Sequence, residues 1–167
     1  YKMHKVIDDF LDKDDFIFIH NLIMNEPFPW FHMESYKETG LDKNKSDNFS
    51  YYLHILYEDT MPVSPHYETI MKCVFKKLDV KSLIRVKVNS YLKGDKLVEH
   101  EKHTDYNYFN NGGVFSINTC DGYTKLDDGT KIHSVANRML LFDASKPHCS
   151  TNTTTQQRRV NINFNYF

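Results

Sequence analysis

The sequence predicts a mainly β protein of the α+β class: a double-stranded β-helix, or jelly roll, with N-terminal helices packed on one sheet. Two observations support this fold class. From residue 82 onward, short β-like runs are separated by turn sequences such as KGD, NNGG, CDG and DDGT. Before residue 80, two segments carry apolar residues at helical spacing. Evenly spaced short strands are typical of an antiparallel sandwich or barrel, and amphipathic helices cover such sheets.

The bulk composition narrows the class of protein. A chain of 167 residues without a Pro-, Gly- or Ser-rich linker predicts a single domain over 1–167, with helical support over about 1–80 and a jelly-roll core over about 82–167. The net charge of -1 gives no specific nucleic-acid signal, and no apolar run reaches membrane-spanning length. Three cysteines without recognisable spacing favour a reducing compartment, so we expect a cytoplasmic location, or the host cytoplasm for a viral protein. The oligomeric state stays open.

The first half of the chain mixes strands and helices. A strand is expected over 5–11, followed by a helix that Asp12 caps and that runs to about Asn25, where EPFPW ends it. Another strand is expected over 49–57, and Ser64-Pro65 opens a second helix. The apolar sides of the two helices consist of Phe16, Ile19, Leu22 and Ile23, and of Ile70, Val74 and Leu78.

The second half consists of short β-like runs in close succession. These are LIRVKVNSYL, VEHEKHTDY, GGVFSINT, GYTKL, KIHSV, RMLLFD, HCSTN and RRVNINFNYF. The pattern predicts about eight strands after the two helices.

The run VEHEKHTDYNYF, at 98–109, is dense in groups that can bind a metal. Side chains alternate along a strand, so Glu101, His103 and Asp105 share one face and His100 the other. His103 and Asp105 then form two-thirds of a 2-His-1-carboxylate facial triad, the set that holds non-haem Fe(II) with open positions. Taken alone, the pair is weak evidence for a metal site and fits a solvated polar strand better.

The third ligand has to come from a distant strand. His133 and His148 are the candidates downstream of the pair. His148 begins the strand that follows RMLLFDASKP, and strands far apart in sequence become neighbours across a jelly-roll mouth. This placement favours His148.

Several linked motifs between about Tyr91 and Phe167 carry a family resemblance. His103-x-Asp105 is followed in order by SINTCDGYT, by ANRMLLFDASKPH ending at His148, and by RRVNINFNYF. This order resembles the prolyl-hydroxylase-like branch of the 2-oxoglutarate/Fe(II)-dependent dioxygenases, and NTCDGYT with ANRMLLFD is similar to a phage and marine-microbial group of that branch. One departure is Gly122-Tyr123, where the family has two glycines.

The resemblance implies both an activity and its cofactors. His103, Asp105 and His148 would bind Fe(II), and 2-oxoglutarate and O2 would occupy the remaining positions. The implied reaction is hydroxylation of a C–H bond with release of succinate and CO2. A prolyl or other peptidyl residue is the default substrate, and a small molecule is the other possibility. A cupin-type metalloenzyme and a non-catalytic jelly-roll binding module are the alternative functions.

The far carboxylate of 2-oxoglutarate needs a buried cation, for which a bidentate arginine is well matched. Arg158 and Arg159 follow His148 at the distance where the family keeps this residue. With Arg159 inward, the asparagines of VNINFNYF face the barrel and its apolar residues face the helices; with Arg158 inward, the two faces exchange. We expect Arg159 to be the clamp.

Further residues are predicted around the cosubstrate by strand position and by the resemblance. The resemblance implies that Tyr91 hydrogen-bonds its carboxylate, and the alternative is a strand aromatic packed in the core. Asn89 shares the face of Tyr91. Asn118 and Thr124 are candidates for the pocket wall, whereas His100 is expected at the surface, at the pocket rim. Substrate specificity is expected in the loops at about 32–48 and 106–112.

Overall fold

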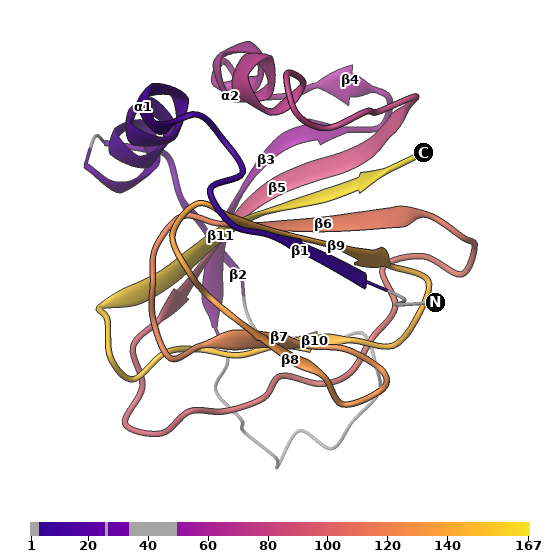
Figure 1. Ribbon diagram of the computed structural model, residues 1–167. Coiled ribbons are helices and arrows are strands. Elements are labelled where there is room, and N and C mark those ends of the chain that lie inside the picture. The colour runs from indigo at the N-terminus through magenta and orange to yellow at the C-terminus, as the bar shows by residue number, and fades with distance from the viewer. Residues whose placement is uncertain (1–3, 26, 34–49) are drawn as a thin grey trace.

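The computed structural model describes residues 4–25, 27–33 and 50–167, and two antiparallel sheets face each other in it (Figure 1). The major sheet has the strand order β1 (His4–Ile7), β9 (Arg138–Asp143), β6 (Asn111–Ser116), β11 (Arg158–Tyr166), β5 (Leu83–Leu92), β3 (Tyr51–Glu58) and β2 (Phe31–Met33), with β4 (Met61–Pro62) paired to β3. The minor sheet has the order β10 (Cys149–Ser150), β7 (Tyr123–Lys125) and β8 (Lys131–His133). This is the predicted jelly roll, and part of the predicted helical support, β1 to β4, extends its major sheet.

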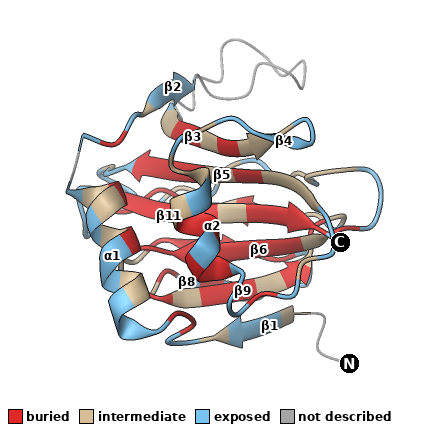
Figure 2. Cartoon of the chain, turned by 90° about the horizontal axis from the view of Figure 1, so that it is seen from above, coloured by how far each residue is buried: buried red, intermediate tan, exposed pale blue. Residues whose placement is uncertain are grey.

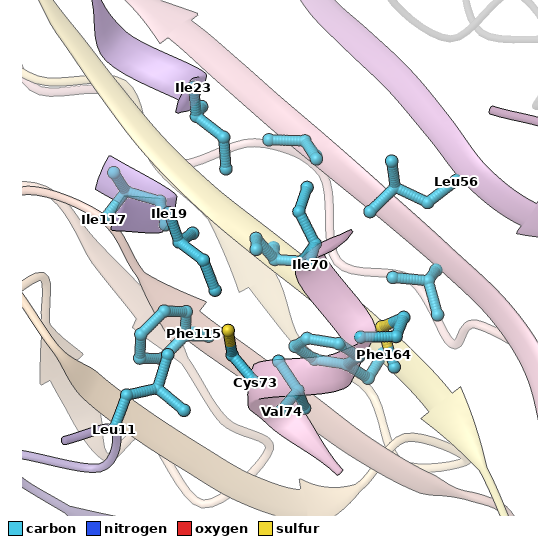
Figure 3. Close-up of a cluster of buried hydrophobic side chains, with 14 of the residues drawn as sticks. Leu11, Ile19, Ile23, Leu56, Ile70, Cys73, Val74, Phe115, Ile117 and Phe164 are labelled. Atoms are coloured by element: carbon cyan, nitrogen blue, oxygen red, sulfur yellow. The ribbon is translucent and has the colours of Figure 1, made fainter. Parts of the chain in front are cut away.

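Two helices, α1 (Lys13–Met24) and α2 (Tyr67–Val74), cover the outer face of the major sheet (Figures 1 and 2). The predicted apolar positions form this contact: Ile19, Ile23, Ile70 and Val74 are fully buried. Figure 3 shows them packed against Phe115 of β6 and Phe164 of β11. Burial of this continuous apolar layer is the main force that holds the helices on the sheet.

Strand β11 lies at the centre of the major sheet, between β5 and β6. Its alternation separates two environments, because Val160, Ile162 and Phe164 belong to the core under the helices, whereas Arg159 and Asn161 are buried on the barrel side. The strand therefore has the register that was expected, with the asparagines inward.

The barrel interior is divided between apolar and polar parts. Beneath β7 and β8, a second apolar cluster consists of Val114, Leu126, Ile132, Leu140, Phe142 and Ala144. On the β5 and β11 side, the inward residues are polar, and Tyr91, Asn89, Lys87 and Arg85 lie opposite Arg159, Asn161, Asn163 and Asn165. The polar part is where a ligand with charged ends can be held.

Three local predictions need correction. The run 98–105 is not a continuous strand, because its pairing with the segment after β9 consists of isolated bridges at Glu99 and His103 and a separate hydrogen bond from Asp105 N to Ala144 O (3.1 Å). Asp12 precedes α1, but its carboxylate accepts a hydrogen bond from Lys77 Nζ (2.9 Å) and makes no cap hydrogen bond. The second helix begins at Tyr67, because the Ser64 hydroxyl pairs with His54 Nε2 (2.7 Å) within a turn.

The remaining predictions concern other parts of the chain. Neither described helix is long and apolar enough to cross a membrane. Most of the loop predicted at 32–48, and the first residue of EPFPW, lie outside the described residues.

Candidate metal centre

His103, Asp105 and His148 come together at the open end of the barrel. Their ligand atoms all lie within 4.8 Å of one another, and Nε2 of each histidine is 3.8 Å from a different oxygen of Asp105. The side chains of Asp105 and His148 are 6% exposed, whereas that of His103 is 39% exposed. Two imidazoles and one carboxylate on one side of a small space can hold a divalent metal and leave its other side open.

Local backbone pairing explains how two residues 45 positions apart meet. His103 and His148 form a bridge in which each backbone N–H donates to the carbonyl of the other, both at 2.9 Å. Each ring is also oriented by the backbone carbonyl two residues before it. Nδ1 of His148 lies 2.9 Å from Lys146 O, and Nδ1 of His103 lies 3.2 Å from Glu101 O. With Nδ1–H donating to a carbonyl, the Nε2 lone pair is directed to the metal position.

The carboxylate of Asp105 is oriented by the last strand of the fold. Asn165 Nδ2 donates to Asp105 Oδ2 (2.8 Å) and also to Asn110 Oδ1 (3.1 Å), which fixes the amide from two sides. On the other oxygen, Arg85 Nη2 lies 3.6 Å from Oδ1. Oriented carboxylates of this kind are typical of metal sites.

The charges at the site suit a metal. Burial raises the pKa of the Asp105 carboxyl, but nearby positive charge from His148 and the hydrogen bond from Asn165 outweigh it, so the pKa is lowered. Burial, together with the proximity of His148, lowers the pKa of His103. A carboxylate that stays ionised beside a histidine that stays neutral is the protonation state that a metal ion requires.

The second feature of the site is the guanidinium of Arg159, which is 1% exposed. It donates to neutral oxygens only: Ser150 Oγ, Thr151 O (3.0 Å), Thr124 Oγ1 (3.1 Å) and Ser134 Oγ (3.4 Å). No carboxylate among the described residues pairs with it. A buried charge without a counter-charge is costly, so the position is suited to an anionic ligand.

Arg159 and the metal ligands are joined through β10. Ser150, which accepts from Arg159, is two residues after His148 and therefore shares its face of the strand. Gly122 makes room for the arginine, because a Cβ there would lie 2.5 Å from Arg159 Cδ and 2.5 Å from Asn152 O. The glycine predicted in the hairpin thus has a steric reason.

The side chain of Arg158 points to the opposite face of β11 and contacts the end of helix α1. Its Nη2 donates to Met24 O (3.0 Å) at the end of α1, and its guanidinium lies 5.5 Å from the centre of the Trp30 ring. These contacts place Arg158 on the helix side, so that of the two adjacent arginines Arg159 is the one on the barrel side. That Arg159 binds a cosubstrate carboxylate stays a prediction.

The residues predicted around Arg159 have different surroundings. Tyr91 stacks on Tyr51 (ring centres 5.4 Å apart) and lies 5.7 Å from the guanidinium carbon of Arg159. Asn89 is fully buried and donates to Asn161 Oδ1 (3.2 Å), while its own Oδ1 has no hydrogen-bond partner. Both side chains thus line the polar part of the barrel, and an acceptor is left there for a ligand that can donate.

Two further residues considered in the sequence, Asn118 and His133, lie in other surroundings. Asn118 Nδ2 donates to Arg158 O (2.8 Å) and its Oδ1 accepts from Val160 N (2.9 Å), so the side chain fastens β11 beyond the end of β6. Each of these two atoms has capacity for one more hydrogen bond, and the cosubstrate contact of Asn118 stays a prediction. His133 is on β8 with its ring 5.5 Å from that of Tyr123, outside the metal cluster.

Sequence reasoning missed three features of the site. His100 is half-buried: its ring packs edge-on against Tyr91 (5.1 Å), and burial, reinforced by Arg159, lowers its pKa to about 4. The irregular backbone at 98–105 removes the strict alternation that had placed it outside. Tyr123 Oη donates to Glu99 (2.7 Å), and this bond connects β7 to the segment 98–105 that carries His103 and Asp105, the ligand loop. The partnership of Asn165 with Asp105 has no signal beyond the inward register of β11.

Comparisons with known proteins give a likeness of structure only. No family model matches the sequence, and no curated protein sequence matches it. Among solved structures, a 2OG-Fe(II) oxygenase family oxidoreductase from Burkholderia pseudomallei has a TM-score of 0.70 at 13% identity, covering 98% of this chain and 84% of that one. At such identity the shared property is the fold.

Two further solved structures are similar. A prolyl hydroxylase from Trichoplax adhaerens, in complex with a fragment of the hypoxia inducible factor oxygen degradation domain, has a TM-score of 0.68 at 17% identity, covering 99% of this chain and 83% of that one. The viral collagen prolyl hydroxylase of Paramecium Bursaria Chlorella virus-1, as a 2OG complex, has a TM-score of 0.62 at 15% identity, covering 98% and 95%. The predicted jelly-roll fold of this enzyme group is thereby confirmed.

Proposed function

We propose that the protein is an Fe(II)- and 2-oxoglutarate-dependent dioxygenase that hydroxylates a C–H bond. The observation that carries this proposal is the pairing of two features in one barrel. A His-Asp-His cluster suits a metal with open positions, and a buried guanidinium without an acidic partner suits the far end of a dicarboxylate. The fold shared with 2OG-Fe(II) oxygenases and prolyl hydroxylases supports the same function.

The donor set fits Fe(II) by its chemistry. His103 and His148 offer imidazole nitrogens and Asp105 offers an ionised oxygen, the combination found at non-haem iron sites. Iron and 2-oxoglutarate, when bound, supply the oxidation, in which O2 gives one atom to the substrate C–H bond and one to succinate as CO2 leaves.

The protein's own residues would bind the cosubstrate, orient the metal ligand and exclude water. Arg159 would neutralise the far carboxylate of 2-oxoglutarate, and its fixed hydrogen bonds to Ser150 and Thr124 hold the guanidinium in place beforehand. Asn165 would keep Asp105 in its liganding orientation. Tyr91 and His100 pack together beside Arg159 and would exclude water from the bound carboxylate.

The alternative functions receive no comparable support. Cupin-type sites usually gather more histidines and a glutamate, whereas only His103, Asp105 and His148 form a possible metal cluster in the described part of the chain. A non-catalytic binding module has no need of a buried, unpaired cation beside a metal cluster, because retaining such a charge lowers stability.

We propose a peptide as the substrate, with a prolyl or other peptidyl residue hydroxylated. The support is the resemblance of the motifs and the structural likeness to the Trichoplax adhaerens prolyl hydroxylase, which is in complex with a peptide fragment. The 39% exposure of the His103 side chain also supports access of an extended chain to the centre.

Anaerobic titration tests this function directly. Purified protein is mixed with Fe(II) and then with 2-oxoglutarate, and visible absorption is recorded. We expect a metal-to-ligand charge-transfer band, absent in His103→Ala and Asp105→Ala and retained in the control His133→Ala. A folded wild-type protein that gives no band would rule the function out. Succinate release in air provides the second measurement.

A further inference from the structure

Two cations on β5 face the barrel beside the metal ligands, and apart from the long contact of Arg85 with Asp105 they have no part in the site described so far. Arg85 and Lys87 alternate with Val86 and Val88, which are buried in the helix-side core. Arg85 and Lys87 therefore lie on the opposite face, in register with Asn165 and Asn163 of β11. They occupy the Asp105 end of the polar interior, whereas Arg159 occupies the other end.

Lys87 has no hydrogen bond or ion pair with any described residue, although it is only partly exposed. Its register partners, Asn163 on β11 and Ile55 on β3, are neutral. Burial, together with the charge of Arg85, lowers its pKa to about 8, against the opposing effects of Asp105 and Glu58. A partly buried ammonium that has no partner in the described part of the chain is suited to an incoming anion.

Arg85 also keeps capacity for a ligand. Its Nη2 lies 3.5 Å from Asn165 Oδ1 and 3.6 Å from Asp105 Oδ1, both long contacts. Its Nε is buried and has no hydrogen-bond partner. The guanidinium is thus steadied beside the metal ligand while one of its donors is unused.

The formal charges point to an anionic substrate group. Bound Fe(II) and 2-oxoglutarate dianion cancel each other, and Asp105 offsets Arg159. Arg85 and Lys87 then remain, and Glu58 is the one described acid besides Asp105 that affects the pKa of Lys87. Even with Glu58 set against one of the cations, positive charge is left next to the substrate side of the metal.

An aromatic surface leads from these cations to solvent. The guanidinium of Arg85 lies over the Tyr106 ring (5.4 Å), Tyr106 stacks on Tyr108 (5.2 Å), and Tyr108 stacks on Phe167 (6.1 Å). Tyr108 and Phe167 are 43% and 45% exposed, and Phe109 beside them is 62% exposed. We call these four residues the aromatic rim. Flat rings beside a cationic pocket can hold a peptide backbone and direct an acidic side chain inward.

We propose that Lys87 and Arg85 form a specificity site that binds a carboxylate of the substrate, and that this carboxylate belongs to an acidic residue of a peptide lying on the aromatic rim. The inference rests on the proposed dioxygenase function. Lys87 contributes the accessible charge, and Arg85 contributes a second donor whose position Asn165 and Tyr106 fix. The site is distinct from Arg159, which serves the cosubstrate.

Peptide pools test the proposal with the metal- and cosubstrate-loaded protein. Capped tetrapeptide pools, with glutamate, glutamine or lysine fixed at one position and the others randomised, are incubated in air, and oxygen incorporation into peptide is measured by mass. We expect the glutamate pools to be modified roughly ten- to a hundredfold more than the matched glutamine pools. Free L-glutamate and L-glutamine form a separate arm, and modification of the free acid alone would overturn the peptide assignment.

Variants test whether Lys87 and Arg85 cause the preference for glutamate over glutamine. Lys87→Met is expected to bring the glutamate-to-glutamine ratio close to one, Lys87→Arg to retain it, and Arg85→Gln to lower it. Lys72→Met, an exposed lysine of α2 on the other side of the sheet, is the control with an unchanged ratio. Because each ratio is taken within one variant, loss of folded protein cancels.

The outcomes separate the two proposals. A wild-type protein without the charge-transfer band contradicts the dioxygenase function itself. A protein with the band but with equal, basic-preferring or no peptide modification contradicts only the carboxylate site. If Lys87→Met instead lost 2-oxoglutarate affinity as Arg159→Ala should, Lys87 would belong to the cosubstrate site, and the inference would be wrong.

Discussion

The two faces of β11 differ in what their burial achieves. On the helix side, Val160, Ile162 and Phe164 are buried among other apolar residues, and their contribution is free energy of folding. On the barrel side, Arg159 and Asn165 are equally buried but depend on a few specific partners. Polar burial gives little net stability, so the barrel face is better explained by ligands than by folding.

This difference shows that alternation lets one strand stabilise the fold with one face and bind ligands with the other. The helix face tolerates replacement by other apolar residues of similar volume, whereas each barrel-face residue is tied to one partner. Substitutions on the first face should therefore change stability, and substitutions on the second should change binding.

The largest expected effect is on the helix face. Phe164→Ala removes a ring that is 1% exposed and should lower the free energy of unfolding by about 3–5 kcal/mol, because it leaves a cavity in the core. Denaturant unfolding measures this. The matched barrel-face variant Asn163→Ala, at a partly exposed site, should change stability by less than about 1 kcal/mol. Equal losses would contradict the division between the faces.

The second effect compares adjacent arginines. Arg159→Ala should weaken 2-oxoglutarate binding by roughly 2–3 kcal/mol, since a buried charged hydrogen-bond partner is lost. Arg158→Ala should leave binding nearly unchanged and cost about 1 kcal/mol of stability, because it loses Met24 O and the Trp30 ring. Anaerobic titration of the charge-transfer band gives the affinities. Similar weakening by both variants would show that the assignment of Arg159 is wrong.

The third effect separates two asparagines of the barrel face. Asn165→Ala should lower metal affinity roughly tenfold to a hundredfold, because Asp105 loses the amide that orients it. Asn161→Ala, whose partner is Asn89, should keep metal affinity close to that of the wild type. Competition with a calibrated chelator provides the measurement. An affinity loss at Asn161 alone would reverse the assigned roles.

The smallest effect is the pH dependence of the loop that carries His103. Hydrogen bonds from Lys125 and Tyr123 lower the pKa of Glu99 from 4.5 to about 2. A carboxyl with a lowered folded pKa adds stability above its unfolded pKa, and this stability disappears as the pH falls from about 4.5 to 2. Its side chain is 34% exposed, so solvent screens the interaction.

Comparison with Glu99→Gln isolates this contribution. Unfolding free energies of the wild type and the variant should differ at pH 6 and converge by about pH 2, while the variant loses this part of the acid dependence. A difference that stays constant with pH would show that Glu99 acts through packing instead of charge.

Much of the fold follows from local patterns. Period-2 alternation in RRVNINFNYF and the helical spacing of Ile70 and Val74 each require a buried face, so their elements and orientations were predictable. The irregular run 98–105 was not, because isolated bridges to a distant segment fix its shape, and local propensity carries no record of them.

The candidate site, like the fold, has features that the sequence predicts and features that depend on distant contacts. The spacing of His103 and Asp105, and the place of His148 and Arg159 after them, are sequence properties, and they identified the principal residues. Placing His100 against Tyr91, and Lys87 near Asp105 without a partner, required distances between residues far apart in the chain.

The sequence by itself thus determined most of the strands and the helix-covered face, because these depend on residue type and period along the chain, and the resemblance of its motifs identified the candidate ligands. Only the tertiary structure decided which polar residues meet inside the barrel. Those meetings depend on how β5, β11 and the ligand loop are brought together, as when Asn165 reaches Asp105 across 60 positions of sequence. The specificity of this protein lies in that second class of contacts.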